Sequence, residues 1–235
     1  MEPLDRTSAF PTSVAAAERV TTFLRSVYGW MCAGLAITAV VAYMIATSPA
    51  LIGALVSNHL LFLALFLVQL GVVFFLSARV DRIAPGTATL LFVAYSALTG
   101  ITFSVILVAY TGASIASTFM VTAGMFGALA LYGTTTSRSL AGVGQFVFMG
   151  LIGLVLASVV GMFWRNAALE FLISVVGVIV FTGLTAWDAQ RLKQMATAVP
   201  ESQLGSYAIL GALSLYLNFI NLFLFLLRFM GGRRD

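Results

Sequence analysis

Charged residues are scarce in this sequence. Only 9% of its 235 residues are Asp, Glu, Lys or Arg, whereas 61% are hydrophobic. A soluble domain carries roughly 25% charged residues, and so few charges could not cover a surface that faces water. The composition therefore excludes an ordinary soluble protein and indicates that a lipid bilayer surrounds most of the chain.

The residues that build common active sites are also scarce. The single cysteine, Cys32, allows no internal disulfide or cysteine metal cluster, and we interpret it as a small buried hydrophobic residue. The single histidine, His59, excludes a multi-histidine zinc hydrolase. A retinal protein needs a lysine within its last helix, but the only lysine of this sequence, Lys193, lies before the last apolar segment. The sequence therefore excludes a retinal protein. Neither a Gly-x-Ser-x-Gly motif nor a glycine-rich phosphate loop occurs, so we expect no enzymatic activity and no bound cofactor.

Long apolar runs are abundant, and their length predicts membrane-spanning helices. A spanning helix needs about 20 apolar residues, and β-barrel strands would alternate apolar and polar residues, which runs such as 60–76 do not. Glycines at helical spacing, such as Gly124 and Gly127, predict faces on which helices pack closely. We predict an all-α protein with a polar arm (1–25), a single membrane domain (26–230) and a short tail (231–235). The predicted spans are 27–47, 58–77, 87–108, 114–134, 142–163, 169–188 and 206–229.

Basic residues in the connections predict orientation. If the spans alternate in direction, eight basic residues lie on the side of the N-terminus and four on the other, which favours a cytoplasmic N-terminus. The basic C-terminal end opposes this assignment and leaves a six-span or re-entrant arrangement open. The twelve basic residues form no patch, so we expect no nucleic-acid binding. The eight are Arg6, Arg19, Arg25, Arg79, Arg82, Arg138, Arg191 and Lys193; the four are Arg165, Arg228, Arg233 and Arg234.

Polar residues inside predicted spans are the candidate functional residues, because a charge at the membrane centre costs about 2.5 kcal/mol or more. Asp188, near the end of the sixth span, is the leading candidate; the alternative is a helix-end aspartate paired with Arg191 one turn later. Asn218 and Asn221 share one face of the last span, either at a cavity or as hydrogen-bonding contacts between helices.

Two further arginines are predicted to lie on the same side of the membrane as Asp188. Arg79 and Arg82 end the second span and either latch onto that aspartate or merely anchor the helix at the membrane surface.

Four segments stand in order along nearly the whole chain. The last span contains LSLYLNFINLF (213–223). The others are VQLGVVF (68–74) with SAR (77–79), SALTGIT (96–102), and TAWD (185–188) with Gln190. These segments resemble the Bax inhibitor-1 family, and its bacterial branch most closely, and the segment 213–223 resembles the family's last-helix signature.

The resemblance implies a fold of six helices in two three-helix layers around a central seventh. It also implies a pH-sensitive calcium leak channel, in which two aspartates share a proton and an arginine latches onto them when the channel is closed. Other bacterial members modulate a membrane-anchored ATP-dependent protease. Carried over to this chain, the pH sensor and gate are Asp188 and Asn218, with Arg79 or else Arg82 as the latch, while Gln69 replaces an acidic position and Asn221 joins the polar cluster.

Asparagine at position 218, where the family usually has aspartate, removes the repulsion between two carboxylates that makes one of them keep its proton. We therefore expect a gate that is less sensitive to pH, or that responds at lower pH. Asp188 and Asn218 could still form a weak calcium site from a carboxylate and an amide oxygen. The competing functions are a protein that modulates a protease or stress pathway and a proton-coupled transporter, although the chain shows no paired interrupted helices of a transporter.

Overall fold

The computed structural model describes residues 9–164 and 166–234, and nearly all of them are helical. Within these described residues, seven helices are long and apolar enough to cross a membrane, which confirms the predicted fold class. Arg6 and Arg165, two of the basic residues used to predict orientation, lie outside the described residues. The elements are α1 (Ala9–Ala46), α2 (Pro49–Ser57), α3 (His59–Arg79), the 3-10 turn η1 (Val80–Arg82), α4 (Pro85–Ala109), α5 (Gly112–Thr135), α6 (Ala141–Phe163), α7 (Ala167–Ala198), the 3-10 turn η2 (Glu201–Gln203) and α8 (Leu204–Met230).

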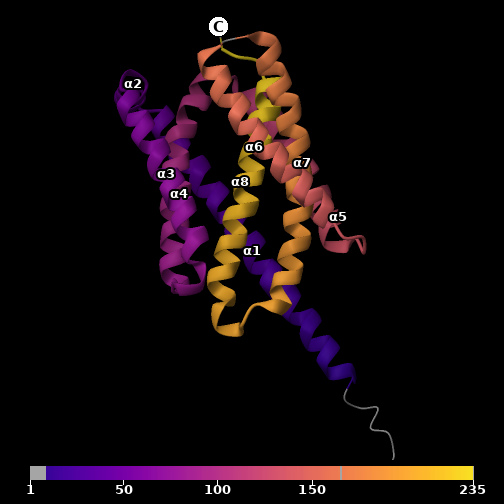
Figure 1. Cartoon of the computed structure of the whole chain (residues 1–235). Helices are drawn as coiled ribbons and strands as arrows, with labels where there is room; N and C mark the ends of the chain where they lie inside the picture. The colour runs from indigo at the N-terminus through magenta and orange to yellow at the C-terminus, as the bar shows by residue number, and fades with distance from the viewer. Residues whose placement is uncertain (1–8, 165, 235) are drawn as a thin grey trace, which may run out of the picture.

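Local sequence signals set where several helices begin. Proline at the first helical position, which needs no backbone N–H there, starts α2 and α4. Side-chain oxygens of Asn58, Thr111 and Asn166 accept hydrogen bonds from the first backbone N–H groups of α3, α5 and α7. These caps keep the connections short, so consecutive spanning helices run in opposite directions (Figure 1).

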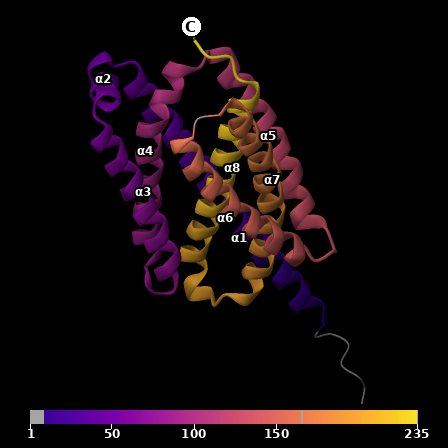
Figure 2. The same cartoon turned by 45° about the horizontal axis from the view of Figure 1, so that its top comes forward.

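Helix α8 is the central element of the bundle. In its most apolar stretch 67% of residues are buried, against 6% to 33% in the other six spans. It packs against α1, α4, α5 and α7, whereas α3 packs mainly on α4 and α6 mainly on α7 (Figures 1 and 2). The structure thus supports a central last helix, but the expected two three-helix layers around it are not confirmed.

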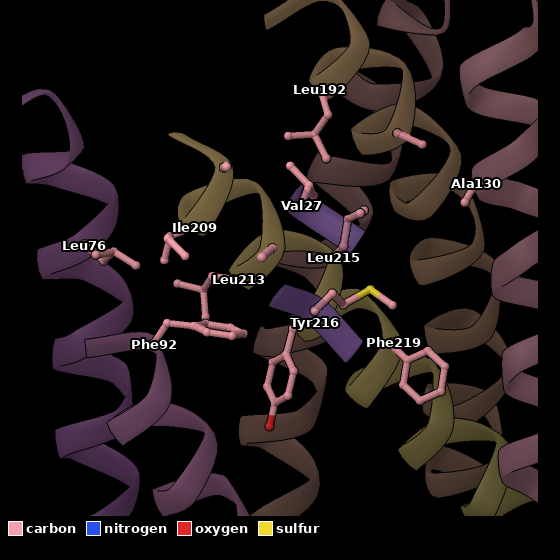
Figure 3. Packing of buried hydrophobic residues seen from close by; sticks show 14 of the residues in the cluster. Val27, Leu76, Phe92, Ala130, Leu192, Ile209, Leu213, Leu215, Tyr216 and Phe219 are labelled. Atoms are coloured by element: carbon pink, nitrogen blue, oxygen red, sulfur yellow. The ribbon is translucent and has the colours of Figure 1, made fainter. Parts of the chain in front are cut away.

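The core forms where α8 crosses α1. Figure 3 shows Leu213, Leu215 and Tyr216 of α8 beside Val27 of α1, with α3 and α4 on one side and Phe219 on the other. Tyr216 is fully buried, and its ring packs edge-on against those of two aromatic residues of α4. This core fixes the rotation of α8 and therefore which of its residues face α7.

Glycines allow α7 to approach its neighbours, as expected where packing rather than water release drives association. A Cβ on Gly133 of α5 would overlap the backbone oxygen of Ala186 of α7. The prediction is right for Gly150, whose Cβ would lie 3.0 Å from Val180 of α7, but wrong for Gly124 and Gly127. These two face open space, and no described neighbouring helix comes within 4 Å of where their Cβ atoms would lie. Helical spacing alone could not show which face of α5 meets a neighbour.

The N-terminal arm continues the first spanning helix. Helix α1 is unbroken from Ala9, so the predicted boundary at residue 25 lies inside it, and its first turns extend beyond the bundle (Figure 1). Arg19 donates to the carbonyl of Val199, and Phe23 is buried. The arm is therefore attached to the connection between α7 and α8.

The C-terminal tail pairs with the connection between α4 and α5. The backbone N–H of Arg234 donates to Ala109 at 3.0 Å, and that of Thr111 donates to Gly232 at 3.2 Å. The chain ends at the opposite face from the α3–α4 and α7–α8 connections (Figure 1). We call the face where the tail lies the C-terminal face, and the face with the α3–α4 and α7–α8 connections the N-terminal face. Because the two faces lie at opposite ends of the bundle, they agree with seven passes rather than six.

Candidate functional site

The centre of the site is a buried carboxyl group. Asp188 lies on α7 and is only 6% exposed. Asn218 of α8, also buried, donates from Nδ2 to Asp188 Oδ2 at 2.7 Å. The structure thus brings together the two residues predicted to form the sensor, on facing turns of α7 and the central helix.

Ser214 is a further member of the site that the sequence did not reveal. Its hydroxyl donates to the same oxygen of Asp188 at 3.3 Å, one helical turn before Asn218. Serine in a membrane helix usually bonds its own backbone, as Ser96 and Ser158 do here, so its type carries no signal. The signal was its spacing of four residues from Asn218, which places both side chains on one face of α8.

A pocket of about 200 Å³ lies beside this cluster, large enough for several water molecules. Asp188 and Ser214 form its inner wall, and Arg191 lies one turn further along α7 toward the N-terminal face. Arg191 is exposed, and its guanidinium lies 5.5 Å from the centre of the Trp187 ring. The pocket therefore joins a buried carboxyl group to a mouth lined by a basic residue. Its other lining residues are Ser77, Leu192, Met195, Leu210 and Gly211.

The structure does not bring the two predicted latch arginines to Asp188. The guanidinium of Arg79 lies 5.9 Å from the centre of the Phe75 ring on its own helix, and Arg82 is exposed in η1. Ser77, two residues before Arg79, does line the pocket, so the end of α3 reaches the site. The latch stays a prediction, and Arg191 is the basic residue that the structure places at the pocket.

The remaining predicted polar residues make structural contacts elsewhere. Gln69 donates to the backbone oxygen of Leu98 at 3.1 Å and so ties α3 to α4. Asn221 donates to Leu217 of its own helix at 2.8 Å. Gln69 therefore makes a bond between two helices, and Asn221 makes a bond within its own helix. Both bonds are structural contacts, which are the alternative to a functional role.

Beyond the cluster, α8 is packed in apolar side chains. Leu222 and Leu227 are almost fully inaccessible, and Phe223 and Leu226 are buried beside them. These residues separate the Asp188 pocket from the C-terminal face. The polar half of α8 thus opens toward one side of the membrane, while the other half closes the bundle.

Gln190, next to the site on α7, fixes the connection between α5 and α6. Its Oε1 accepts from the N–H of Leu140 at 2.8 Å, and its Nε2 donates to the carbonyl of Arg138 at 2.9 Å. Both groups of the side chain are thereby satisfied. Gln190 therefore ties the α5–α6 connection to α7, two residues after Asp188.

Comparison with known proteins gives the family. A family model described as "Inhibitor of apoptosis-promoting Bax1" matches residues 20–235. The chain is 49% identical over 234 residues to the inner membrane protein YbhL of Escherichia coli K12, covering 98% of this chain and 100% of that protein. It belongs to the Bax inhibitor-1 family. It is also 45% identical to an uncharacterized protein of Borreliella burgdorferi, over 91% of this chain and 93% of that protein.

The donors available in this Bax inhibitor-1 site bear on whether it suits a calcium ion. Calcium takes six to eight oxygen ligands in a stable site. Among the described residues no group of three acidic, histidine or cysteine side chains could hold a metal ion. Oδ2 of Asp188 already accepts two hydrogen bonds, which leaves its Oδ1 as the free carboxyl oxygen. Such a donor set suits an ion in passage better than one that is stored.

Proposed function

We propose that this protein is a cation leak channel of the bacterial inner membrane, with calcium as a permeant ion and its gate at Asp188. The single observation that supports this most directly is a buried carboxyl group on a pocket, hydrogen-bonded to the central helix. A carboxyl group inside the membrane is costly. The position of this carboxyl group beside a pocket of about 200 Å³ supports a role in attracting and releasing a cation.

In this proposal the pair of Asp188 and Asn218 holds α8 in a closed arrangement. Two donors from α8, at residues 214 and 218, bond one oxygen of Asp188, while buried leucines block the other half. An ion that binds Asp188 competes for the carboxyl oxygen that these bonds use, weakens them and so frees α8 to move. The N-terminal face, which carries most basic residues of the connections, faces the cytoplasm.

The test is calcium flux into liposomes that contain an indicator dye and the purified protein. Asp188→Asn, which keeps the shape but removes the charge, should reduce flux about tenfold or more. The matched control is Glu170→Gln, the same change on an exposed residue of the same helix. Equal flux through the wild type and Asp188→Asn would reject Asp188 as the ion-attracting group.

The pH dependence forms the second part of this test. Asn218→Asp places two carboxylates in contact, so the pair shares a proton near neutral pH and flux becomes steeply dependent on pH there. The wild type should show a shallower dependence, or one at lower pH. A wild-type profile as steep as that of Asn218→Asp, at the same pH, would refute the role proposed for Asn218.

A second candidate function is modulation of a membrane-anchored ATP-dependent protease through direct contact. The observation that favours it is the start of α1, where residues 14–18 are exposed and extend beyond the bundle (Figure 1). Deleting residues 1–17 stops before the contacts of Arg19 and Phe23 and should keep the fold intact. Loss of the effect on the protease with unchanged calcium flux would favour this function over the channel.

A further inference from the structure

A lateral groove between α1 and α5 has no part in the proposed function. It encloses about 430 Å³, and its floor is formed partly by Phe219 of α8. The walls are almost wholly apolar, with Leu35 on α1 and Ala123 and Leu131 on α5 among them. Because both helices span the membrane, this groove opens to lipid rather than to water.

The length of the groove matches one leaflet of a bilayer. Its lining residues on α5 run from Phe119 to Thr134, which is roughly 22 Å at the rise of an α-helix. One leaflet, with its head-group region included, spans about 20–22 Å. The Thr134 end lies at the N-terminal face, where α5 ends, so an acyl chain in the groove would have its head group there.

Basic side chains gather at this end of the groove. Lys193 donates from Nζ to the backbone oxygen of Thr134, a lining residue, at 2.8 Å. Arg25 is exposed on α1, one turn before the lining residue Tyr28 and on the same side of that helix. Glu18 is the nearest acidic residue along α1, seven positions from Arg25. Positive charge at the mouth of an apolar, membrane-embedded groove is the pattern that binds anionic lipid head groups.

We propose that the groove between α1 and α5 binds an anionic phospholipid, with one acyl chain over Phe219 and the phosphate at Arg25 and Lys193. Zwitterionic lipid fills the same groove more weakly, because the basic residues attract net negative charge. The site is separate from Asp188, so its test does not depend on ion conduction.

Two glycines of α5 give a matched pair of variants. Gly127 lines the groove and Gly124 does not, yet both have open space where a side chain would begin. Gly127→Leu therefore fills the groove without displacing the fold, and Gly124→Leu is the control. We would incorporate each full-length protein into vesicles of equal phosphatidylglycerol and phosphatidylcholine, extract it in mild detergent and count retained lipids by native mass spectrometry.

The wild type and Gly124→Leu should retain phosphatidylglycerol in preference, and Gly127→Leu should lose it. Each of Arg25→Gln and Lys193→Gln should weaken retention about fivefold, the factor that corresponds to about 1 kcal/mol for each basic residue near the membrane surface. Equal retention of both lipids by the wild type, or unchanged retention in Gly127→Leu, would overturn the proposal.

The single cysteine supplies a second measurement on the folded protein. Cys32 is exposed and lines the groove, contrary to the expectation of a buried residue, so a bound acyl chain should shield its thiol from a membrane-permeant maleimide. The thiol should react more slowly in vesicles that contain phosphatidylglycerol than in vesicles of phosphatidylcholine alone. Arg25→Gln combined with Lys193→Gln should remove the difference. Equal reaction rates in both kinds of vesicle for the wild type would again refute the proposal.

Discussion

The hydrogen bond between Asp188 and Asn218 makes a quantitative prediction about stability. Asn218→Ala removes the shorter of the two bonds to the carboxyl group, at 2.7 Å, and leaves the weaker one from Ser214 at 3.3 Å. A hydrogen bond to a charged group contributes about 1.5–3 kcal/mol in water-soluble proteins, whereas bonds between membrane helices contribute about 0.6 kcal/mol and at most about 1.7. Because Asp188 is buried at the edge of a pocket, we expect a coupling of about 1–2 kcal/mol.

A double-mutant cycle isolates this coupling. The free energy of unfolding would be measured in mixed detergent micelles for Asp188→Ala, Asn218→Ala, the double variant and the wild type. The destabilisations of the two single variants should sum to about 1–2 kcal/mol more than the destabilisation of the double variant. That difference corresponds to about 2–8 °C in Tm for a chain of this size.

The control cycle pairs Asp188→Ala with Asn221→Ala. Asn221 is the same residue type on the same helix but bonds its own backbone, so these effects should add within about 0.5 kcal/mol. If the Asp188–Asn218 cycle were equally additive, the bond would not hold α8 to α7, and the closed arrangement that we propose would lose its support.

Three further predictions concern the packing around the site. Gly133→Val should destabilise the fold by at least about 1–3 kcal/mol, because its Cβ meets the backbone of α7, whereas Gly124→Val should change stability by less than about 0.5 kcal/mol; equal effects in thermal unfolding would contradict this. Gln190→Leu leaves a buried backbone N–H without its partner at a cost of about 1–3 kcal/mol, and should speed proteolysis of the α5–α6 connection at low protease concentration. Tyr216→Phe removes a hydroxyl bonded to α1 at 2.6 Å and should lower the free energy of unfolding by about 0.5–1.5 kcal/mol, which a denaturation midpoint unchanged from the wild type would exclude.

The spans were predictable because bilayer thickness imposes both length and composition. The second span, predicted at 58–77, is α3 (His59–Arg79), and the last, predicted at 206–229, is α8 (Leu204–Met230). The sixth is wrong at its end: predicted to stop at 188, α7 continues to Ala198. Hydropathy detects the lipid-facing part of a helix, and a helix that leaves the membrane remains helical without that signal.

Short or buried features were less predictable. Helix α2 is too short to span, and we predicted a connection there; its nine residues are apolar but fall well below the length that a bilayer requires. The contact between Asp188 and Asn218 followed from the family resemblance, not from spacing, because residues 30 positions apart carry no local signal. Ser214 joined the site only once the rotation of α8 was known, whereas the spacing of one helical turn had already placed Arg191 near Asp188.

The constraints on α8 suggest where its movement would begin. One face of the helix is bonded to α7 through Asp188, and its start is held to η1 by a bond from Tyr207 to Asp81. Its C-terminal half is locked in apolar packing, and the tail beyond it pairs with the α4–α5 connection. The bond at Asp188 borders the pocket of about 200 Å³, whereas the apolar contacts of the C-terminal half do not. In the channel that we propose, a change in cation concentration therefore acts first on the N-terminal half of α8, and we expect the bond between Asp188 and Asn218 to break before the leucine-packed half opens.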